Sequence, residues 1–227
     1  MTGLPGVARD VHPIEQRSYA ILRSRLDTSG LPPWTRVVVE RVVHASADLA
    51  YATDLVCAES ALVAAVAALR SGAPLVADVE MVAAGVTGRR AICRIRDPRA
   101  ADLARSAAAV RLAVAEVGAG AVWVIGCAPT ALAELVALRP DPALVIGLPV
   151  GFVGAVEAKQ ALRESGLPAV SNRSEKGGSA VAAAAVNALL HGLSEIRPGG
   201  GTPGGGETRA GFRLAGRAAS EQEVGHE

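Results

Sequence analysis

The chain has 227 residues, half of them apolar, and a formal net charge of +1 that comes from dispersed charges. This length and composition predict one globular domain with a substantial core. Since no run of Lys or Arg occurs and only two Trp, two Tyr and two Phe residues are present, we expect neither DNA nor RNA as a partner.

Membrane and metal signals are weak in this sequence. No apolar run reaches the roughly 18 to 20 residues that span a bilayer, and the N-terminal residues lack the basic-then-apolar pattern of a secretory signal, so we expect a cytoplasmic protein. Cys57, Cys93 and Cys127 are too far apart for a paired zinc motif, and their odd number argues against a disulfide framework. We therefore expect no bound metal.

The elements are predicted in chain order from proline positions and apolar spacing. Helices are expected from Pro13 to about Leu26, from Pro32-Pro33 to about Ala50, and from Glu59 to Arg70. Five short strands then alternate with helices, at Pro74–Ala77, Ala91–Ile95, Ala121–Ile125, Ala143–Ile146 and Pro168–Val170. This alternation predicts an α/β fold of three layers, α/β/α, with a mainly parallel five-stranded sheet after N-terminal helices.

The last part of the chain has a different composition. Glycine and proline dominate from Pro198 to Gly206, and a charged segment follows. We therefore predict a folded domain over residues 1–195 and a disordered tail over residues 196–227.

Ligands of such sheets bind beyond the carboxyl ends of the strands. The predicted ends carry small and polar residues, namely Asp78-Val79-Glu80-Met81, Gly126-Cys127-Ala128-Pro129-Thr130, the glycine-containing loop Gly147–Gly154, and Asn172-Arg173 leading to Gly177-Gly178-Ser179. Small residues let the backbone approach a ligand, and the N–H groups that open each following helix favour an anion. These turns indicate a binding cleft, although glycine also serves simple tight turns.

His44 is the residue best suited to acid–base chemistry. Helical spacing places it beside an apolar stripe formed by Val38, Val39, Val42 and Val43, so we expect its ring against the core. By residue type alone, a buried structural histidine is the more common interpretation, and a catalytic one stays open. Nucleotide binding is disfavoured, because the sequence lacks a dinucleotide fingerprint and a Walker lysine.

Several segments together resemble the precorrin-8X methylmutase family, also called precorrin isomerase, of cobalamin biosynthesis. The resemblance runs from about Ile14 to Leu190. It rests on Ile14-Glu15-Gln16-Arg17-Ser18, Arg41-Val42-Val43-His44-Ala45, Asp78-Val79-Glu80-Met81-Val82, Arg105-Ser106-Ala107-Ala108-Ala109, Ile125-Gly126-Cys127-Ala128-Pro129-Thr130, Gly147-Leu148-Pro149-Val150-Gly151-Phe152-Val153-Gly154 and Gly177-Gly178-Ser179.

The resemblance implies a flavodoxin-like domain that works as a homodimer on a tetrapyrrole substrate. It implies that a methyl group migrates from C-11 to C-12 of precorrin-8X to give hydrogenobyrinic acid, without any cofactor. It further implies that His44 gives a proton to a ring nitrogen and takes it back.

The same resemblance suggests residues that bind the substrate. Ser18 and Arg105 match family residues beside it, and Arg41 lies in the motif that carries His44. The acetate and propionate groups of the substrate suit arginine and helix N-termini. Thr130 and Ser179 are expected either to bind a carboxylate or to cap a helix. Asp78 is expected to contact the substrate or to hold a loop or an arginine in place.

The chain departs from the family pattern at a few positions. Segments before Ala91 and before Arg105 are shorter than in many relatives, and Ala104 replaces a threonine. Ser174-Glu175 stands where Gly-Arg is common. The open alternatives are a cobalt-containing precorrin-8 substrate, a non-catalytic tetrapyrrole carrier, and a nucleotide-binding regulatory module.

Overall fold

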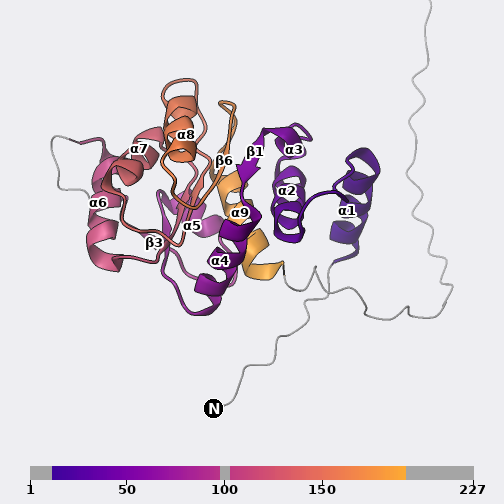
Figure 1. Cartoon of the computed structure of the whole chain (residues 1–227), viewed down its shortest axis with the longest axis horizontal. Coiled ribbons are helices and arrows are strands. Elements are labelled where there is room, and N and C mark those ends of the chain that lie inside the picture. The colour runs from indigo at the N-terminus through magenta and orange to yellow at the C-terminus, as the bar shows by residue number, and fades with distance from the viewer. Residues whose placement is uncertain (1–11, 98–102, 193–227) are drawn as a thin grey trace, which may run out of the picture. The chain divides into compact units, whose positions relative to one another are not determined.

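The computed structural model describes residues 12–97 and 103–192. These residues form nine helices and six strands (Figure 1). The helices are α1 Pro13–Arg25, α2 Pro33–Ser46, α3 Tyr51–Asp54, α4 Glu59–Arg70, α5 Glu80–Gly85, α6 Arg105–Val117, α7 Pro129–Leu138, α8 Ala155–Glu164 and α9 Ser179–His191. The strands are β1 Leu55–Cys57, β2 Leu75–Ala77, β3 Ile92–Cys93, β4 Val122–Ile125, β5 Leu144–Gly147 and β6 Ala169–Asn172.

The strands form one mixed, mostly parallel sheet in the order β1-β6-β5-β4-β2-β3. The five strands predicted from the sequence are present and pair in parallel. The predicted strand number was wrong, because the described residues include a sixth strand, β1, which pairs antiparallel with β6 through Leu55 and Asn172. The sheet therefore has six strands rather than five, and it is mainly parallel with one antiparallel edge strand.

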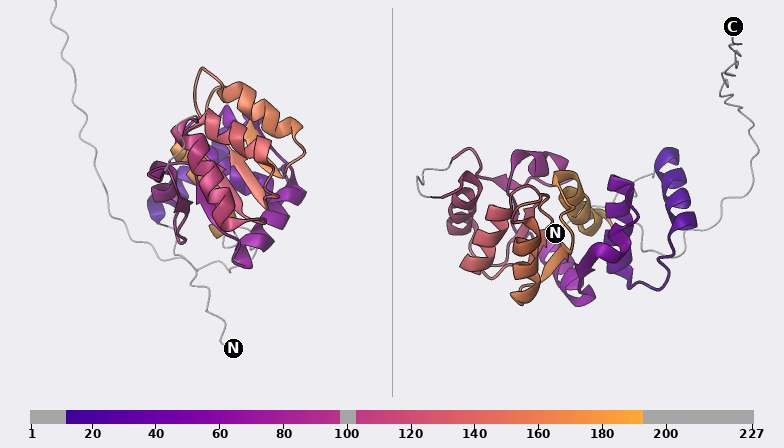
Figure 2. Two further views of the ribbon diagram at one scale, coloured as in Figure 1. Left: turned by 90° about the vertical axis from the view of Figure 1, so that its left-hand side faces the viewer. Right: turned by 90° about the horizontal axis from the view of Figure 1, so that it is seen from above.

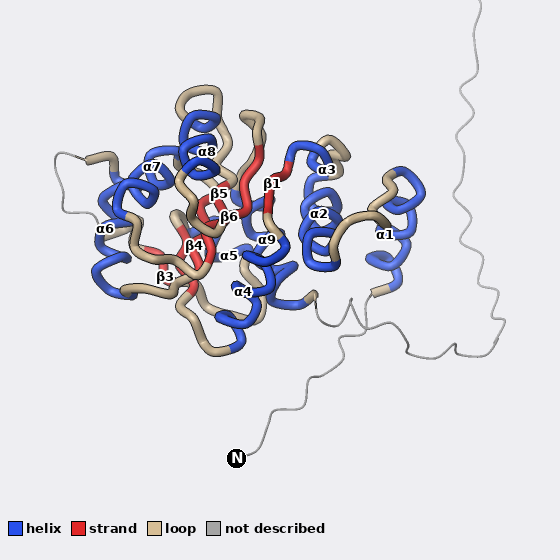
Figure 3. The backbone as a smooth tube through the Cα atoms, viewed as in Figure 1, coloured by secondary structure: helices blue, strands red, loops and turns tan. Residues whose placement is uncertain are grey.

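Side chains of the central strands alternate between two apolar clusters. Val122 and Val124 of β4 pack with residues of α2, α4, α5 and α9, whereas Trp123 and Ile125 pack with α6, α7 and α8. Successive residues of a strand point to opposite faces, which explains why one strand serves both clusters. The predicted helices on both faces are confirmed, and Figures 2 and 3 show the strands lying between the two groups of helices.

The N-terminal helices begin as predicted and end earlier than predicted. Proline occupies the first turn of both α1 and α2, where its missing N–H costs nothing. The second helix was expected to reach Ala50, but α2 ends at Ser46 because Ala47 adopts a left-handed conformation with φ of 54°. The chain then turns into α3 and β1.

One glycine marks a close approach between the helices and the strand ends. A Cβ atom at Gly126 would lie 2.8 Å from Cβ of Ala182 and 3.0 Å from Cα of Ser179. Gly126 therefore lets α9 pack directly on the turn that follows β4.

The predicted domain boundary at residues 195 and 196 and the predicted tail lie outside the described residues. Among the residues that are described, no helix has the length and apolar character needed to cross a membrane.

Candidate functional site

His44 lies in the last turn of α2, half-buried against α1. A hydrogen bond of 3.0 Å joins its Nδ1 atom to Oγ of Ser18 on α1. Within residues 12–97 and 103–192, its Nε2 atom makes no hydrogen bond. The imidazole is therefore held through one nitrogen, and the other has no partner among the described residues.

The face of the His44 ring is covered by Tyr19. The two ring centroids lie 4.7 Å apart, and the ring planes differ by 6°. Tyr19 is buried, and its hydroxyl accepts a hydrogen bond of 3.3 Å from Arg41. Arg41 also forms an ion pair of 2.6 Å with Glu15. The predicted substrate ligand Arg41 is thus held by two residues of α1, and its contact with a substrate stays a prediction.

Asp78 binds the turn that precedes α7. Its carboxylate is buried and accepts hydrogen bonds from the backbone N–H groups of Gly126, Cys127 and Ala128, at 3.1, 2.8 and 3.0 Å. Burial raises the pKa of Asp78, although these backbone hydrogen bonds oppose the rise. Of the two roles left open by the sequence, the structure shows the loop-holding one.

Three other predicted ligands lie at the starts of helices. Arg105 is the first residue of α6 and is exposed, while its neighbour Ser106 forms a hydrogen bond of 2.7 Å with Thr130 at the start of α7. Ser179 is buried at the start of α9, beside Gly126. The N-cap residues of these helices are Ala104, Ala128 and Gly178, so none of the three side chains is at the cap position, and the carboxylate-binding role stays a prediction.

The loop between β5 and α8 runs beside the loop between β6 and α9. Gly151 N–H donates to the carbonyl of Glu175 at 3.1 Å, and Gly178 N–H donates to the carbonyl of Leu148 at 2.9 Å. Directly after Gly151, Phe152 and Val153 are 95% and 88% exposed. Two adjacent large apolar residues are thus exposed to solvent on this loop.

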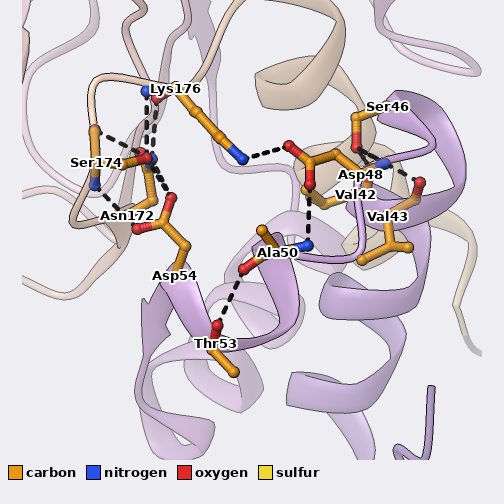
Figure 4. A network of polar contacts seen from close by, with 10 residues as sticks. All are labelled: Val42, Val43, Ser46, Asp48, Ala50, Thr53, Asp54, Asn172, Ser174 and Lys176. Atoms are coloured by element: carbon orange, nitrogen blue, oxygen red, sulfur yellow. Dashed lines mark hydrogen bonds and ion pairs between the residues drawn. The ribbon is translucent and has the colours of Figure 1, made fainter.

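A polar network joins the end of α2 to the loop between β6 and α9 (Figure 4). Lys176 forms an ion pair of 2.6 Å with Asp48, which follows His44 by four residues. Asp54 accepts hydrogen bonds from the side chain of Asn172 and from the N–H and hydroxyl of Ser174. Burial acts against ionisation of Asp54, but these donors outweigh it and lower its pKa. The network ties the His44 helix to the strand ends.

Ser174-Glu175, where the resemblance leads one to expect Gly-Arg, is part of this network. Ser174 supplies its hydroxyl to Asp54 at 2.6 Å. Glu175 is exposed, so its negative charge lies in solvent.

A cavity in the described residues lies elsewhere, at the edge of the sheet beside β3. It measures about 720 Å³ and is lined by residues of α5, β3 and their surroundings, including Glu80, Arg89, Arg90, Arg94 and Glu116. Two ion pairs with carboxylates engage Arg94, and Arg89 donates to the carbonyl of Leu69. Because the lining of this cavity does not include His44, we take the residues around His44 as the candidate site.

No cluster of three or more potential metal ligands occurs in residues 12–97 and 103–192. Sequence reasoning missed Tyr19, Glu15 and the contact between Asp48 and Lys176. The spacing of Glu15 and Tyr19, four residues apart on a helix, could have indicated a shared face, but no sequence signal identified their partners on α2.

Comparison with known proteins agrees with the resemblance seen in the sequence. The family model described as Precorrin-8X methylmutase matches residues 13–192. A precorrin-8X methylmutase of Sinorhizobium sp. is 43% identical over 80% of this chain and 94% of its own length. A cobalt-precorrin-8 methylmutase of Methanothermobacter thermautotrophicus is 40% identical over 78% of this chain and 91% of its own length.

A crystal structure of a precorrin-8X methyl mutase from Thermus thermophilus superposes with a TM-score of 0.73 at 33% identity, and covers 81% of this chain and 98% of that one. The sequence match and the shared fold extend over nearly all the described residues. The chain therefore belongs to the precorrin-8X methylmutase family of cobalamin biosynthesis, whose members are intramolecular transferases of the isomerase class.

Proposed function

We propose that this protein moves a methyl group from C-11 to C-12 of precorrin-8X and releases hydrogenobyrinic acid. The product is an isomer of the substrate, so the reaction needs no oxidant and no external methyl donor. In this proposal, Nε2 of His44 gives a proton to a ring nitrogen, which makes the adjacent ring electron-poor and eases a 1,5-sigmatropic shift. The proton then returns to Nε2.

The observation that carries this proposal is the hydrogen bonding of the two nitrogens of the His44 ring. Nδ1 is bonded to Ser18, and Nε2 has no hydrogen-bond partner among the described side chains. A general acid must reach the reacting atom within hydrogen-bond distance, and Nε2 is the atom left available for this. Its position beside a polar network at the strand ends supports this proposal, because ligands of parallel sheets bind beyond the carboxyl ends of the strands.

The same strand ends supply groups that suit the carboxylates of the substrate. We propose that Arg105, Thr130 and Ser179 bind acetate or propionate groups. Arg105 and Ser179 lie at the starts of helices whose N–H groups favour an anion, and Thr130 offers an exposed hydroxyl. Ser18 would contact the substrate beside His44. For Asp78 we favour a supporting role, since its carboxylate already occupies the N–H groups that open α7.

We assign the fold to the flavodoxin-like class, and we propose that the enzyme is a homodimer. Counted along the chain, the five parallel strands β2 to β6 lie in the order 2-1-3-4-5, which is the order of flavodoxin-like sheets. The dimer rests on the family resemblance, and a partner subunit would cover the exposed side chains of Phe152 and Val153. Sedimentation equilibrium tests this assembly.

The second candidate function is the same reaction on the cobalt-containing form of the substrate. Relatives named for precorrin-8X and for cobalt-precorrin-8 match at 43% and 40% identity, so similarity favours neither route. A cobalt ion in the substrate is held by the macrocycle rather than by the protein. Our choice of the metal-free substrate therefore depends on the following test.

Purified protein is mixed anaerobically with precorrin-8X or with cobalt-precorrin-8, and the visible spectrum is followed. Faster conversion of precorrin-8X to the hydrogenobyrinic acid chromophore supports the proposal. Faster conversion of the cobalt compound moves the enzyme to the oxygen-independent route. Tight binding of both compounds without conversion of either would contradict the proposed reaction and favour a carrier.

A further inference from the structure

Two adjacent residues of α1 hold the His44 ring in different ways. Ser18 contacts the edge of the ring at Nδ1, at 3.0 Å, whereas Tyr19 covers a face at 4.7 Å between centroids. The edge contact favours one of the two χ2 orientations of the ring, the one with Nδ1 toward Ser18. The parallel stack fixes the plane in which the ring lies. Together they leave the imidazole little freedom of orientation.

Tyr19 is itself held at its far end. Its hydroxyl accepts a hydrogen bond from Nη1 of Arg41, and the same nitrogen is paired with Glu15. Glu15 precedes Tyr19 by four residues on α1, and Arg41 precedes His44 by three residues on α2, so each pair shares one face of its helix. The contacts run in a continuous chain from Glu15 through Arg41 and Tyr19 to His44 across the two helices.

The surroundings of this set favour an ionised Arg41. The hydrogen bonds and charges of Tyr19 and Glu15 outweigh burial and raise the pKa of Arg41. Arg41 therefore remains a permanent cation and hydrogen-bond donor to Tyr19. The guanidinium of Arg23 also lies 5.4 Å from the Tyr19 ring centroid, and Arg23 pairs with the buried Glu40. These contacts dock the face of α1 that carries Ser18 and Tyr19 onto α2.

From this geometry we propose that Tyr19, held by Arg41 and Glu15, is a positioning residue that keeps the His44 imidazole turned with Nδ1 on Ser18 and Nε2 toward the substrate. The proposal rests on the proposed role of His44. It gives Arg41 a role that differs from binding a substrate carboxylate. A ligand role of Arg41 predicts a higher KM on its removal, whereas a positioning role predicts a lower kcat.

The central variant is Tyr19→Leu, which removes the stacked ring and keeps an apolar side chain. Its matched control is Tyr51→Leu, which removes the other tyrosine of the sequence. Tyr51 is buried in α3 and has no ring contact with His44 in the described residues. Both variants lose a buried aromatic ring, so a difference between them reports the contact with His44.

The first readout needs no substrate. The ¹⁵N resonances of the His44 imidazole in the free protein report which nitrogen carries the proton. We expect Tyr19→Leu to shift the balance between the two tautomers and Tyr51→Leu to leave it as in the wild type. Unchanged His44 resonances in folded Tyr19→Leu would overturn the proposal.

The second readout is the rate of methyl migration. We expect kcat of Tyr19→Leu to fall on the order of 10- to 100-fold with KM nearly unchanged, because the catalytic group is misplaced rather than removed. A fall in kcat without any change in the His44 resonances would also overturn the positioning role. A change in the resonances with an undiminished kcat would support positioning and contradict the proposed proton transfer instead.

Two milder variants keep the proposal testable if Tyr19→Leu fails to fold. Tyr19→Phe keeps the ring and loses its hydrogen bond to Arg41, and Arg41→Met removes the group that holds both Tyr19 and Glu15. Both should change the His44 tautomer balance in the same direction as Tyr19→Leu, to a smaller degree. Wild-type resonances in both would overturn the role of Arg41 and Glu15.

Discussion

Lys159 gives a prediction that depends on one buried charge. This residue of α8 is fully buried, and its ammonium group donates hydrogen bonds to the carbonyls of Ser174 and, at 2.8 Å, Lys176. It therefore holds the loop between β6 and α9, which also carries the ion pair to Asp48. The perturbation is a change of pH, compared between the wild type and Lys159→Met.

The magnitude follows from the pKa of Lys159. Burial lowers this pKa from 10.5 to about 8, and Asp54 opposes the change. At about 1.36 kcal/mol per pH unit, the difference corresponds to about 3 kcal/mol. Between pH 8 and 10.5, the unfolded chain holds the lysine proton while the folded chain has lost it. Stability attributable to Lys159 therefore rises with pH across this window and is lowest below pH 8.

The assay is urea unfolding of both proteins at several values between pH 7 and 11. The difference between their free energies of unfolding cancels the titration of groups that both proteins share. We expect the wild type to gain about 3 kcal/mol relative to Lys159→Met between pH 7 and 11. A constant difference over this range would refute the reasoning, since it would mean that Lys159 has the same pKa in the folded and unfolded chains.

Three further predictions concern single substitutions in and near the site. Ser18→Ala removes the partner of His44 Nδ1, and because such a bond contributes ~0.5–1.5 kcal/mol, kcat should fall by up to about tenfold; wild-type kinetics would contradict this. Gly126→Ala places a Cβ atom 2.8 Å from Ala182 and should cost ~1–3 kcal/mol in thermal unfolding, whereas Gly30→Ala, with nothing within 4 Å, serves as its control. Arg105→Ala should raise KM about tenfold while stability changes by less than about 0.5 kcal/mol, because the side chain is exposed; an unchanged KM would remove Arg105 from the substrate site.

The parts of the fold that the sequence predicted are those with a strong local pattern. The parallel strands were visible because each is an apolar run between turn residues, and α1 and α2 because proline opens each of them. Strand β1 was missed because Leu55–Cys57 lies between α3 and α4 with no glycine or proline to mark its ends. Its identity as a strand depends on pairing with β6, which no local pattern reveals.

The candidate site could be predicted only in part for a similar reason. His44 was singled out from its residue type and from the resemblance. The contact of Asp78 with the loop before α7 corresponds to one of the alternatives given for it, and its contact with a substrate stays a prediction. The stack of Tyr19 on His44 and the ion pair between Asp48 and Lys176 join segments that are 25 and 128 residues apart. Such contacts are set by how α1, α2 and α9 pack, and packing is a tertiary property that spacing along the chain does not encode.

The most direct test of the account is the turnover of precorrin-8X by His44→Ala under anaerobic conditions. The control is His191→Ala at the end of α9, where the imidazole contacts Thr87. A positioned general acid contributes about 100- to 10,000-fold, so we expect a rate loss of that order for His44→Ala and a rate near the wild type for the control. A folded His44→Ala protein that converts precorrin-8X at the wild-type rate would contradict the central claim that His44 carries the proton.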